Sequence, residues 1–250
     1  MSCQVCRPDP YVSVVIPAFN EEANLASTTT LIARKLDELK TSFEVIIVND
    51  GSADRTRAIA GELAQADSRI RLINHERNLG PGSGVFTGIK ASRGEFVIFI
   101  PADLGLDINE LYKYIDASRS CDLVVGVRSD RRDYTLFRKF VSLTNIALIK
   151  LLFGMKERQF NYIHMYRRTM LERIEIESRG VFITAEIMIK AHDLGYRLQE
   201  VDITYVPRSA VKATCGKPRV ILRTVKDLFR LWWKRTLKRA EYLRLEQNAK

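Results

Sequence analysis

Short runs of apolar, β-branched residues alternate with longer stretches of helical periodicity through the first half of this chain. The run at residues 12–16 is followed, at residues 22–39, by leucine and isoleucine at the spacing of an amphipathic helix. The same unit recurs at residues 43–66, 70–91 and 96–117, and a last apolar run at residues 123–127 closes the series. Repeated strand–helix units predict a mostly parallel sheet with helices on both faces, and burial of both faces explains why the runs are apolar throughout.

After residue 127 the pattern changes without a linker rich in Pro, Gly or Ser. The expected elements are a helix at 137–153, a strand at 162–166, a helix at 184–194 and a strand at 198–206. We therefore predict an extension at 1–10, one continuous α/β domain at 11–206 and a tail at 207–250. Over 250 residues, 46% apolar content supports a core that needs no disulfides. Four scattered cysteines and no signal-peptide pattern before residue 12 lead us to expect a cytoplasmic protein.

The excess positive charge of the chain lies in the tail. Residues 1–206 hold 27 Lys and Arg against 27 Asp and Glu, whereas residues 207–250 hold 13 against 3. Residues 219–244 have helical spacing, with basic residues on one side and an apolar arc on the other: Ile221, Leu222, Val225, Leu228, Phe229, Trp232, Trp233 and Leu243. Such a helix is typical of proteins that lie on anionic membranes, where each basic residue contributes about 1 kcal/mol.

Alternatives for this tail remain open. The apolar arc can pack on the protein's own core, or the tail can dock on a small membrane protein. Nucleic acid is disfavoured, because no base-reading motif is present and Trp232 and Trp233 lie on the apolar side. Residues 140–155 are too short and too polar to span a bilayer. We therefore expect a peripheral protein on the cytosolic face of a membrane.

Polar or glycine-rich loops follow four of the predicted strands. They occupy residues 17–22, 49–56, 78–84 and 101–104. In an open α/β sheet, ligands bind beyond the carboxyl ends of the strands, so these loops are candidates for one site. Their acidic residues suit a base, a ribose or a divalent cation. The alternative is that the loops are ordinary turns, in which Ser52 or Asp54 caps a helix.

The same loops carry a family pattern in the stretches VSVVIPAFNEEANL, FEVIIVNDGSADRT, NLGPGSGVFTGIKASRGEFVIFIPADL and VVGVR. These stretches resemble family 2 glycosyltransferases of the GT-A fold, and among them polyprenyl-phosphate sugar synthases such as dolichyl-phosphate mannose synthases. The resemblance is strong over residues 12–128 and weaker to residue 208. It implies a Rossmann-like sheet and an inverting enzyme that moves a sugar from a GDP- or UDP-linked donor to dolichyl or undecaprenyl phosphate.

The resemblance also implies a donor site. The residues that match its nucleotide-sugar positions are Pro17, Ala18, Phe19, Glu21, Val48, Asp50, Ala102, Asp103 and Arg208. Asp103 matches the second carboxylate of the family's metal-binding D-x-D motif, which implies Mg²⁺ or Mn²⁺ as cofactor. Pro101 stands where the first carboxylate is expected, and Gly105 replaces the Gln that often follows. Asp107 is a candidate to compensate for the lost carboxylate, or it caps the next helix.

The acceptor side matches less completely. Arg128 and Arg138 match arginines that the resemblance assigns to phosphate groups, and Glu186 matches a carboxylate on a later helix. His164 stands where the family has an arginine, and Lys212 or Lys217 is a candidate to replace a lysine expected at Thr214.

The type of acceptor decides whether a base is needed. A phosphate acceptor is already ionised, whereas a hydroxyl acceptor requires a base, for which His164, Asp133 and Glu186 are candidates. A soluble hydroxyl acceptor, and nucleotide-sugar binding without turnover, are the alternative functions. A homo-oligomer is a further possibility.

Overall fold

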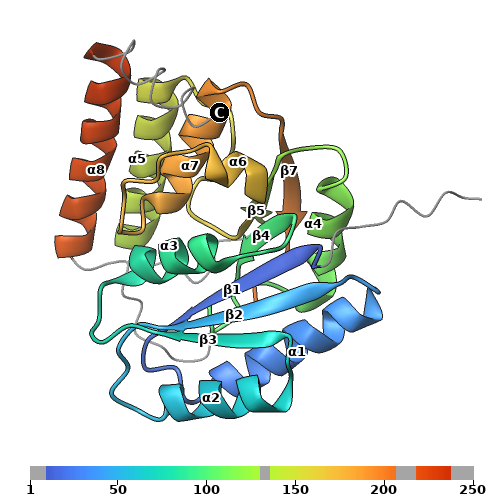
Figure 1. The fold of residues 1–250 in the computed structure, drawn as a ribbon. Helices are drawn as coiled ribbons and strands as arrows, with labels where there is room; N and C mark the ends of the chain where they lie inside the picture. The colour runs from blue at the N-terminus through green and yellow to red at the C-terminus, as the bar shows by residue number, and fades with distance from the viewer. Residues whose placement is uncertain (1–9, 130–135, 207–217, 238–250) are drawn as a thin grey trace, which may run out of the picture.

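A computed structural model describes residues 10–129, 136–206 and 218–237 of the chain (Figure 1). Within these residues one sheet has the strand order β3-β2-β1-β4-β6-β5-β7. The strands are β1 (Val12–Ala18), β2 (Phe43–Asn49), β3 (Ile70–Asn74), β4 (Phe96–Phe99), β5 (Leu123–Arg128), β6 (His164–Arg167) and β7 (Leu198–Ile203). Only β6 runs antiparallel to its neighbours, β4 and β5, so the sheet is mostly parallel as predicted.

Helices cover both faces of this sheet. They are α1 (Leu25–Glu38), α2 (Thr56–Ala66), α3 (Pro81–Ala91), the 3₁₀ helix η1 (Ile108–Glu110), α4 (Leu111–Ala117), α5 (Leu136–Phe153), α6 (Arg168–Glu172), α7 (Ile183–Asp193) and α8 (Pro218–Leu237). Figure 1 shows α1 and α2 on one side of β1–β3 and α3 on the other. The α/β architecture predicted from the sequence is confirmed.

Alternate residues of each strand face opposite layers, because successive side chains of a strand point to opposite faces. Val15 and Ile46 lie in one apolar cluster with residues of α3, α5, α7 and α8. Val14 and Val45 lie in the other, with residues of α1, α2 and α4. Both faces of the central strands are therefore buried, which accounts for the continuous apolar runs in the sequence.

Most element boundaries fall within a few residues of those predicted. The structure adds α6, which the sequence analysis missed, and the predicted helix at 109–117 begins with the 3₁₀ turn η1. The predicted strand at 198–206 ends at Ile203. Among the described residues, no helix combines the length and the apolar character needed to cross a membrane.

The predicted tail includes α8, which packs against the domain. Leu228 and Leu231 of α8 are buried in the α3–α5–α7 core layer. Arg235 forms a two-pronged ion pair with Asp193 at the end of α7, with N–O distances of 2.8 and 2.7 Å. The apolar arc predicted as one surface is thus divided, because part of it packs on the protein itself and Leu222, Val225, Phe229 and Trp233 remain exposed.

Candidate active site

The loops after β1 and β2 are joined by side-chain hydrogen bonds. The backbone N–H of Asn20 donates to Ser52 Oγ at 3.0 Å, and the N–H of Ala53 donates back to Asn20 Oδ1 at 2.9 Å. The N–H of Glu21 donates to Thr56 Oγ1 at 2.8 Å. Ser52 therefore does more than complete a turn, because it helps to fix the loop that carries the predicted nucleotide contacts Phe19 and Glu21.

Asp54 has the capping role that the sequence analysis gave as its alternative. Its Oδ1 accepts the backbone N–H of Thr56 at 3.0 Å, at the start of α2, and also the hydroxyl of Thr56. Its Oδ2 accepts the N–H of Glu22 at 3.2 Å. Burial raises the pKa of Asp54, but the hydrogen bonds from Thr56 and Glu22 hold it below its ordinary value.

Asp50, which directly follows β2, is buried and accepts three hydrogen bonds. Its Oδ1 accepts from His75 Nδ1 at 2.7 Å and from the N–H of Leu79 at 3.0 Å, and its Oδ2 accepts from the N–H of Gly80 at 2.9 Å. The second ring nitrogen of His75 lies 2.9 Å from Thr87 Oγ1 in α3. Asp50 thereby links the end of β3 to the glycine-rich loop that precedes α3. His75 was not identified from the sequence, although it directly follows the last residue of β3.

The glycine-rich loop is confined by a second loop. A Cβ on Gly82 would lie 2.4 Å from the carbonyl oxygen of Gly180, so no side chain fits there. The Arg179 guanidinium lies 3.6 Å from the centre of the Phe86 ring in α3. Pro81 occupies the first turn of α3, where its missing N–H costs nothing. The N-terminus of α3 therefore has a fixed position at the carboxyl edge, where the positive end of the helix dipole suits an anion.

The segment after β4 is a tight turn that contains Asp103. The N–H of Leu104 donates to the Pro101 carbonyl at 2.9 Å, and Leu104 and Gly105 both have positive φ, at 59° and 78°. The side chain of Asp107 accepts the N–H of Asn109 at 2.9 Å and so caps η1. Of the two possibilities for Asp107, the structure shows the cap.

The residues around Asp103 fit a cation only in a limited way. Among the described residues, no group of three or more His, Cys, Asp or Glu side chains could hold a metal ion. Asp103, in the turn after β4, supplies one carboxylate, and Pro101 supplies none. The residues present therefore suit a divalent cation whose other ligands come from a diphosphate or water.

Arg128 ends β5 and is 8% exposed. Its backbone N–H donates to Gln159 Oε1 at 2.9 Å, and its guanidinium carbon lies 3.2 Å from the centre of the Tyr205 ring. This stacking holds the guanidinium beside the segment that follows β7. Tyr205 was not identified from the sequence.

Asp50, Asp103 and Arg128 follow or end β2, β4 and β5, three parallel strands at one edge of the sheet. One strand separates β2 from β4, and one separates β4 from β5, so each step along the edge is about 10 Å. The three residues thus share an edge, but they do not contact one another in the interactions described. Asp50 bonds with the glycine-rich loop, whereas Arg128 stacks on Tyr205.

Several predicted donor-side residues are structural. Val48 and Ala18 are buried in the two core layers, at 0% and 1% exposure. Ala102 is also buried, and its carbonyl accepts the Thr28 hydroxyl at 2.6 Å. Pro17 lies against the glycine-rich loop, because a Cβ on Gly84 would lie 3.0 Å from Pro17 Cβ. Val48, Ala18 and Ala102 are thus packed in the core, and Pro17 packs against the glycine-rich loop.

His164 begins β6 close to this edge, level with the end of β4, but its side chain lies in the core. Its ring is fully buried, Nδ1 accepts the N–H of Gly126 at 3.2 Å, and Nε2 lies 3.2 Å from the Phe160 carbonyl. Burial lowers the pKa of His164 to about 4, so the ring is neutral. A buried ring with both nitrogens bonded has no nitrogen left to act as a base.

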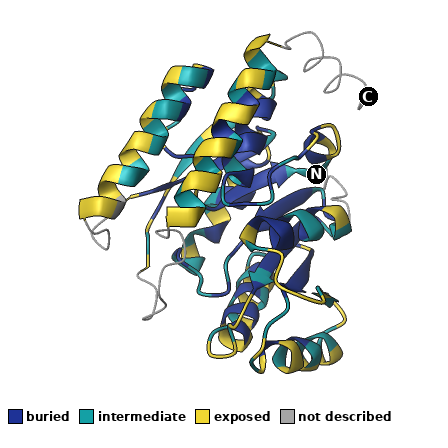
Figure 2. Cartoon of the chain, turned by 90° about the vertical axis from the view of Figure 1, so that its left-hand side faces the viewer, coloured by how far each residue is buried: buried dark blue, intermediate teal, exposed yellow. Residues whose placement is uncertain are grey.

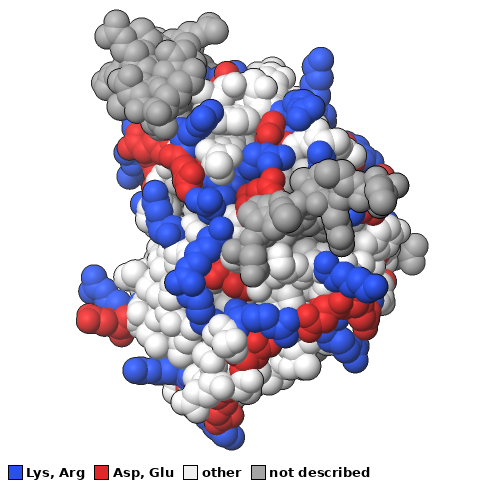
Figure 3. All heavy atoms as spheres, turned by 45° about the vertical axis from the view of Figure 1, so that its right-hand side comes forward, with Lys and Arg blue, Asp and Glu red and all other residues white. Residues whose placement is uncertain are grey.

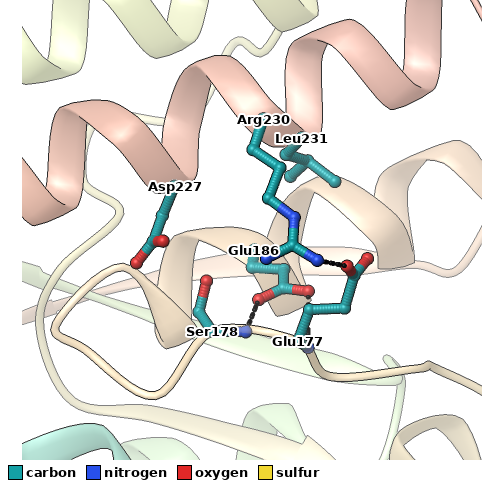
Figure 4. Close-up of a pocket in the computed structure, with 6 residues that line it drawn as sticks. All are labelled: Glu177, Ser178, Glu186, Asp227, Arg230 and Leu231. Atoms are coloured by element: carbon teal, nitrogen blue, oxygen red, sulfur yellow. Dashed lines mark hydrogen bonds and ion pairs between the residues drawn. The ribbon is translucent and has the colours of Figure 1, made fainter.

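Glu186 lies beneath α8 rather than at the edge (Figure 4). Its carboxylate accepts the N–H groups of Glu177 and Ser178, at 2.9 and 2.7 Å, and lies 3.1 Å from Lys190 Nζ. A cavity of about 20 Å³ adjoins it, which is room for a water molecule and not for a sugar. The geometry gives Glu186 a structural role in holding the loop before α7.

The remaining predicted residues cannot be placed. Arg208, Lys212 and Lys217 lie outside the described residues, as does Asp133. Arg138 is in the first turn of α5, but its side chain is also outside the described part.

Comparisons with known proteins identify the family pattern. Residues 13–179 match the family model described as glycosyl transferase family 2. The chain is 29% identical over 238 residues to glycosyltransferase AglD of Haloferax volcanii, covering 91% of this chain and 38% of that protein. It is 28% identical over 215 residues to an undecaprenyl-phosphate 4-deoxy-4-formamido-L-arabinose transferase of Edwardsiella ictaluri, covering 84% and 65%. The chain thus spans less than two thirds of these relatives.

A solved structure shares the fold. Glucosyl-3-phosphoglycerate synthase from Mycobacterium tuberculosis, in complex with Mn²⁺, uridine-diphosphate-glucose and phosphoglyceric acid, matches with a TM-score of 0.67. The match has 19% sequence identity and covers 89% of this chain and 80% of that one.

Proposed function

The chain belongs to glycosyl transferase family 2, and from this premise we propose that it transfers a sugar from a nucleotide-sugar donor to a polyprenyl phosphate, with inversion, at a membrane surface. The observation that carries the proposal is the alignment of Asp50, Asp103 and Arg128 along one carboxyl edge of the sheet. The relatives named undecaprenyl-phosphate transferases support the choice of acceptor.

The donor lies along this edge from β2 toward β5. The loop held by Asp50, with Phe19 and Glu21 beside it, binds the nucleoside. The diphosphate then lies between the N-terminus of α3 and Asp103, where backbone N–H groups and a cation offset its charge. The span of about 20 Å from Asp50 to Arg128 accommodates an extended nucleotide sugar with an acceptor phosphate at its far end.

Asp103 would hold Mg²⁺ or Mn²⁺ together with the donor's diphosphate. When bound, the cation neutralises charge that develops on the leaving nucleotide. Asp103 would thereby anchor the cation near the middle of the edge, between the proposed nucleoside loop and Arg128. The solved relative described with Mn²⁺ and uridine-diphosphate-glucose supports this assignment.

The state of the candidate bases favours a phosphate acceptor. A hydroxyl acceptor needs a base within hydrogen-bond reach, but of the candidate bases that the structure describes, His164 is buried and Glu186 is bonded beneath α8. The third candidate, Asp133, lies outside the described residues. A phosphate oxygen is already ionised near neutral pH and attacks without a base. Arg128, with Arg138, binds the acceptor phosphate and aligns one of its oxygens for in-line attack on the anomeric carbon.

Substitution of Asp103 tests the proposal. Transfer from GDP- and UDP-sugars to short polyprenyl phosphates should require Mg²⁺ or Mn²⁺ and should fall at least about 100-fold in Asp103→Asn and Asp103→Ala. The exposed Asp116→Asn variant on α4 is the matched control and should keep full activity. Transfer that persists in both Asp103 variants would refute the assigned site.

The alternative functions give different outcomes in the same assay. Transfer to a soluble hydroxyl acceptor such as phosphoglyceric acid, and none to polyprenyl phosphate, would identify a soluble-acceptor enzyme. Calorimetric binding of nucleotide sugars without turnover on any acceptor would identify a binding protein, consistent with Pro101 at the first carboxylate position.

A further inference from the structure

The solvent-facing side of α5 is apolar along its length. Its exposed large residues are Leu136, Phe137, Phe140, Leu143 and Leu151, with exposed fractions of 88, 61, 67, 49 and 80%. Leu136, Phe140, Leu143 and Leu151 recur at offsets of four, seven and fifteen, which places them on one face. The opposite face is also apolar, since Ile149 and Phe153 are buried in the core. A helix that is apolar on both sides belongs between a core and a second apolar medium.

The neighbouring helix α8 has a similar exposed stripe. It consists of Leu222, Val225, Phe229, Trp233 and Leu237. Together the two helices hold ten of the fourteen exposed large apolar residues identified in the described part of the chain, so the exposed apolar surface is concentrated here. Figure 2 faces these helices and shows exposed residues along the outward sides of both, and α5 and α8 contact one another. We call this two-helix area the α5–α8 surface.

The charge of the α5–α8 surface has one sign. Helix α5 contains no acidic residue, and the single acidic residue of α8, Asp227, is half-buried toward Glu186. Exposed basic residues border the apolar stripes, including Lys139, Arg219 and Lys226. The face drawn in Figure 3 differs, because acidic and basic side chains lie next to one another there.

We propose that the α5–α8 surface is a lipid-docking surface that inserts its apolar stripes into an anionic bilayer interface. An apolar stripe bordered by positive charge complements the acyl region and the anionic headgroups at the same time. A soluble protein partner would need a matching acidic rim around an apolar groove, whereas an anionic bilayer offers both along its whole surface. The consequence of docking, access to a lipid-linked acceptor, rests on the proposed function; the docking itself does not. The surface also adds α5 to the membrane contact that the sequence predicts for residues 219–244.

The position of the surface fits that consequence. Helix α5 begins eight residues after Arg128, the strand-end arginine of the candidate site. At α8, Arg223 Nη1 lies 3.9 Å from the point that a Cβ on Gly80 would occupy, in the glycine-rich loop. Docking through these helices therefore brings the carboxyl edge of the sheet close to the headgroups, where a lipid phosphate lies.

Sedimentation of the full chain with vesicles tests the proposal, using vesicles with 30 mol% phosphatidylglycerol and vesicles of phosphatidylcholine alone. The parent protein should bind the anionic vesicles. The double variants Phe140→Ser/Leu151→Ser in α5 and Leu222→Ser/Phe229→Ser in α8 should each bind at least about tenfold more weakly. Tyr112→Ser, at an exposed aromatic residue on α4, is the matched control and should bind as the parent does.

A second measurement does not depend on the variants. The only tryptophans of the chain are Trp232 and Trp233, so a blue shift of their emission on anionic vesicles, quenched by brominated lipids, should accompany binding. Binding that is unchanged in the α5 variant would remove α5 from the surface. A dimer in solution with no vesicle binding would overturn the proposal and identify a second copy as the occupant.

Failure of the inference is distinguishable from failure of the proposed function. Vesicle binding needs neither donor nor acceptor, and the substituted residues lie outside the candidate site. Transfer to a short, water-soluble polyprenyl phosphate should therefore survive in variants that no longer bind vesicles. If the parent shows no transfer at all, the vesicle results still decide whether the α5–α8 surface binds lipid.

Discussion

The hydrogen-bond chain from Thr87 through His75 to Asp50 fixes the orientation of a buried carboxylate. Because a carboxylate only accepts, His75 Nδ1 donates in the 2.7 Å bond to Asp50, and Nε2 lies 2.9 Å from the Thr87 hydroxyl. Asp50 in turn holds the N–H groups of Leu79 and Gly80. His75 is thus a positioning residue for the loop that we propose binds the nucleoside.

Two amide variants separate the bonds of His75. In His75→Asn the side-chain amide can take the place of Nδ1 and keep the hydrogen bond to Asp50. In His75→Gln the amide can take the place of Nε2 instead, and the hydrogen bond to Asp50 is lost. Loss of a hydrogen bond to a charged group costs about 1.5–3 kcal/mol, so calorimetry should show affinity for UDP or GDP falling about tenfold or more in the Gln variant and little in the Asn variant. Equal affinities in both variants would contradict this role.

His164 makes folding stability depend on pH. Its folded pKa of about 4 lies below its ordinary value near 6.5, so between these values the unfolded chain binds a proton that the folded chain does not. Stability is therefore complete above about pH 6.5 and falls as the pH drops toward 4. Urea denaturation should show a loss of about 2 kcal/mol from pH 7 to pH 5 that His164→Asn abolishes and the exposed-site control His192→Gln retains.

For single residues, the sequence predicted where the site residues lie better than it predicted which residues they contact. Asp50 was placed at a strand end from the loop pattern and Arg128 from the resemblance, and the structure puts both at strand ends. Their partners His75 and Tyr205 were missed, because contacts between residues 25 or more positions apart depend on strand register and order, which local periodicity does not encode. The same limit applies to His164, whose burial follows from β6 lying inside the sheet.

Helix α8 shows how tertiary packing redistributes an amphipathic pattern. The sequence predicts an apolar arc opposite a basic one, but Arg230 and Lys234 of the basic side reach Glu177 of the domain, at 3.2 and 2.5 Å. Leu228 and Leu231 then face the core. Periodicity establishes the helix and its two faces, but the choice of which arc meets the domain depends on the charges that lie opposite.

The contacts of Glu177 predict an acid-sensitive attachment of α8. Burial raises the pKa of Glu177, but the Lys234 hydrogen bond and the charges of Lys190, Lys234 and Arg230 lower it more, so it ends below its ordinary value. A lowered carboxyl pKa stabilises the folded state above about pH 4.5, and this contribution is lost as the pH falls through the folded pKa. Solvent screening limits it to about 1 kcal/mol.

Tryptophan emission reports this attachment, because both tryptophans lie on α8. Glu177→Gln should lower the urea midpoint of the emission change at pH 7 and should flatten its dependence on pH below about 4.5. Glu172→Gln, an exposed glutamate paired with Arg168, should leave both unchanged. A midpoint that is insensitive to Glu177→Gln would show that apolar packing alone holds α8.

At the scale of the whole molecule, the layered α/β architecture could be predicted and the complete strand order could not. Alternation of period-two and helical segments fixes the layers, and both core clusters follow from it. The insertion of antiparallel β6 between β4 and β5 could not be read, because a strand has the same periodicity in either direction. Its insertion moves Arg128 one strand further from Asp103 and so sets the width of the candidate site.

The distribution of charge over the molecule predicts salt-sensitive lipid binding. The chain carries a formal net charge of +10, and the residues before position 207 are balanced, so attraction to an anionic bilayer acts mainly through the α8 side. Raising NaCl from 0.05 to 0.5 M shortens the Debye length and should weaken binding to anionic vesicles about tenfold or more, while the apolar contribution remains. Lys226→Glu should weaken binding at low salt and reduce this salt dependence. Arg57→Glu makes the same charge change on α2, across the sheet, and should alter neither the binding at low salt nor its salt dependence. Equal effects of the two substitutions would show that net charge, and not the α5–α8 surface, controls the attraction.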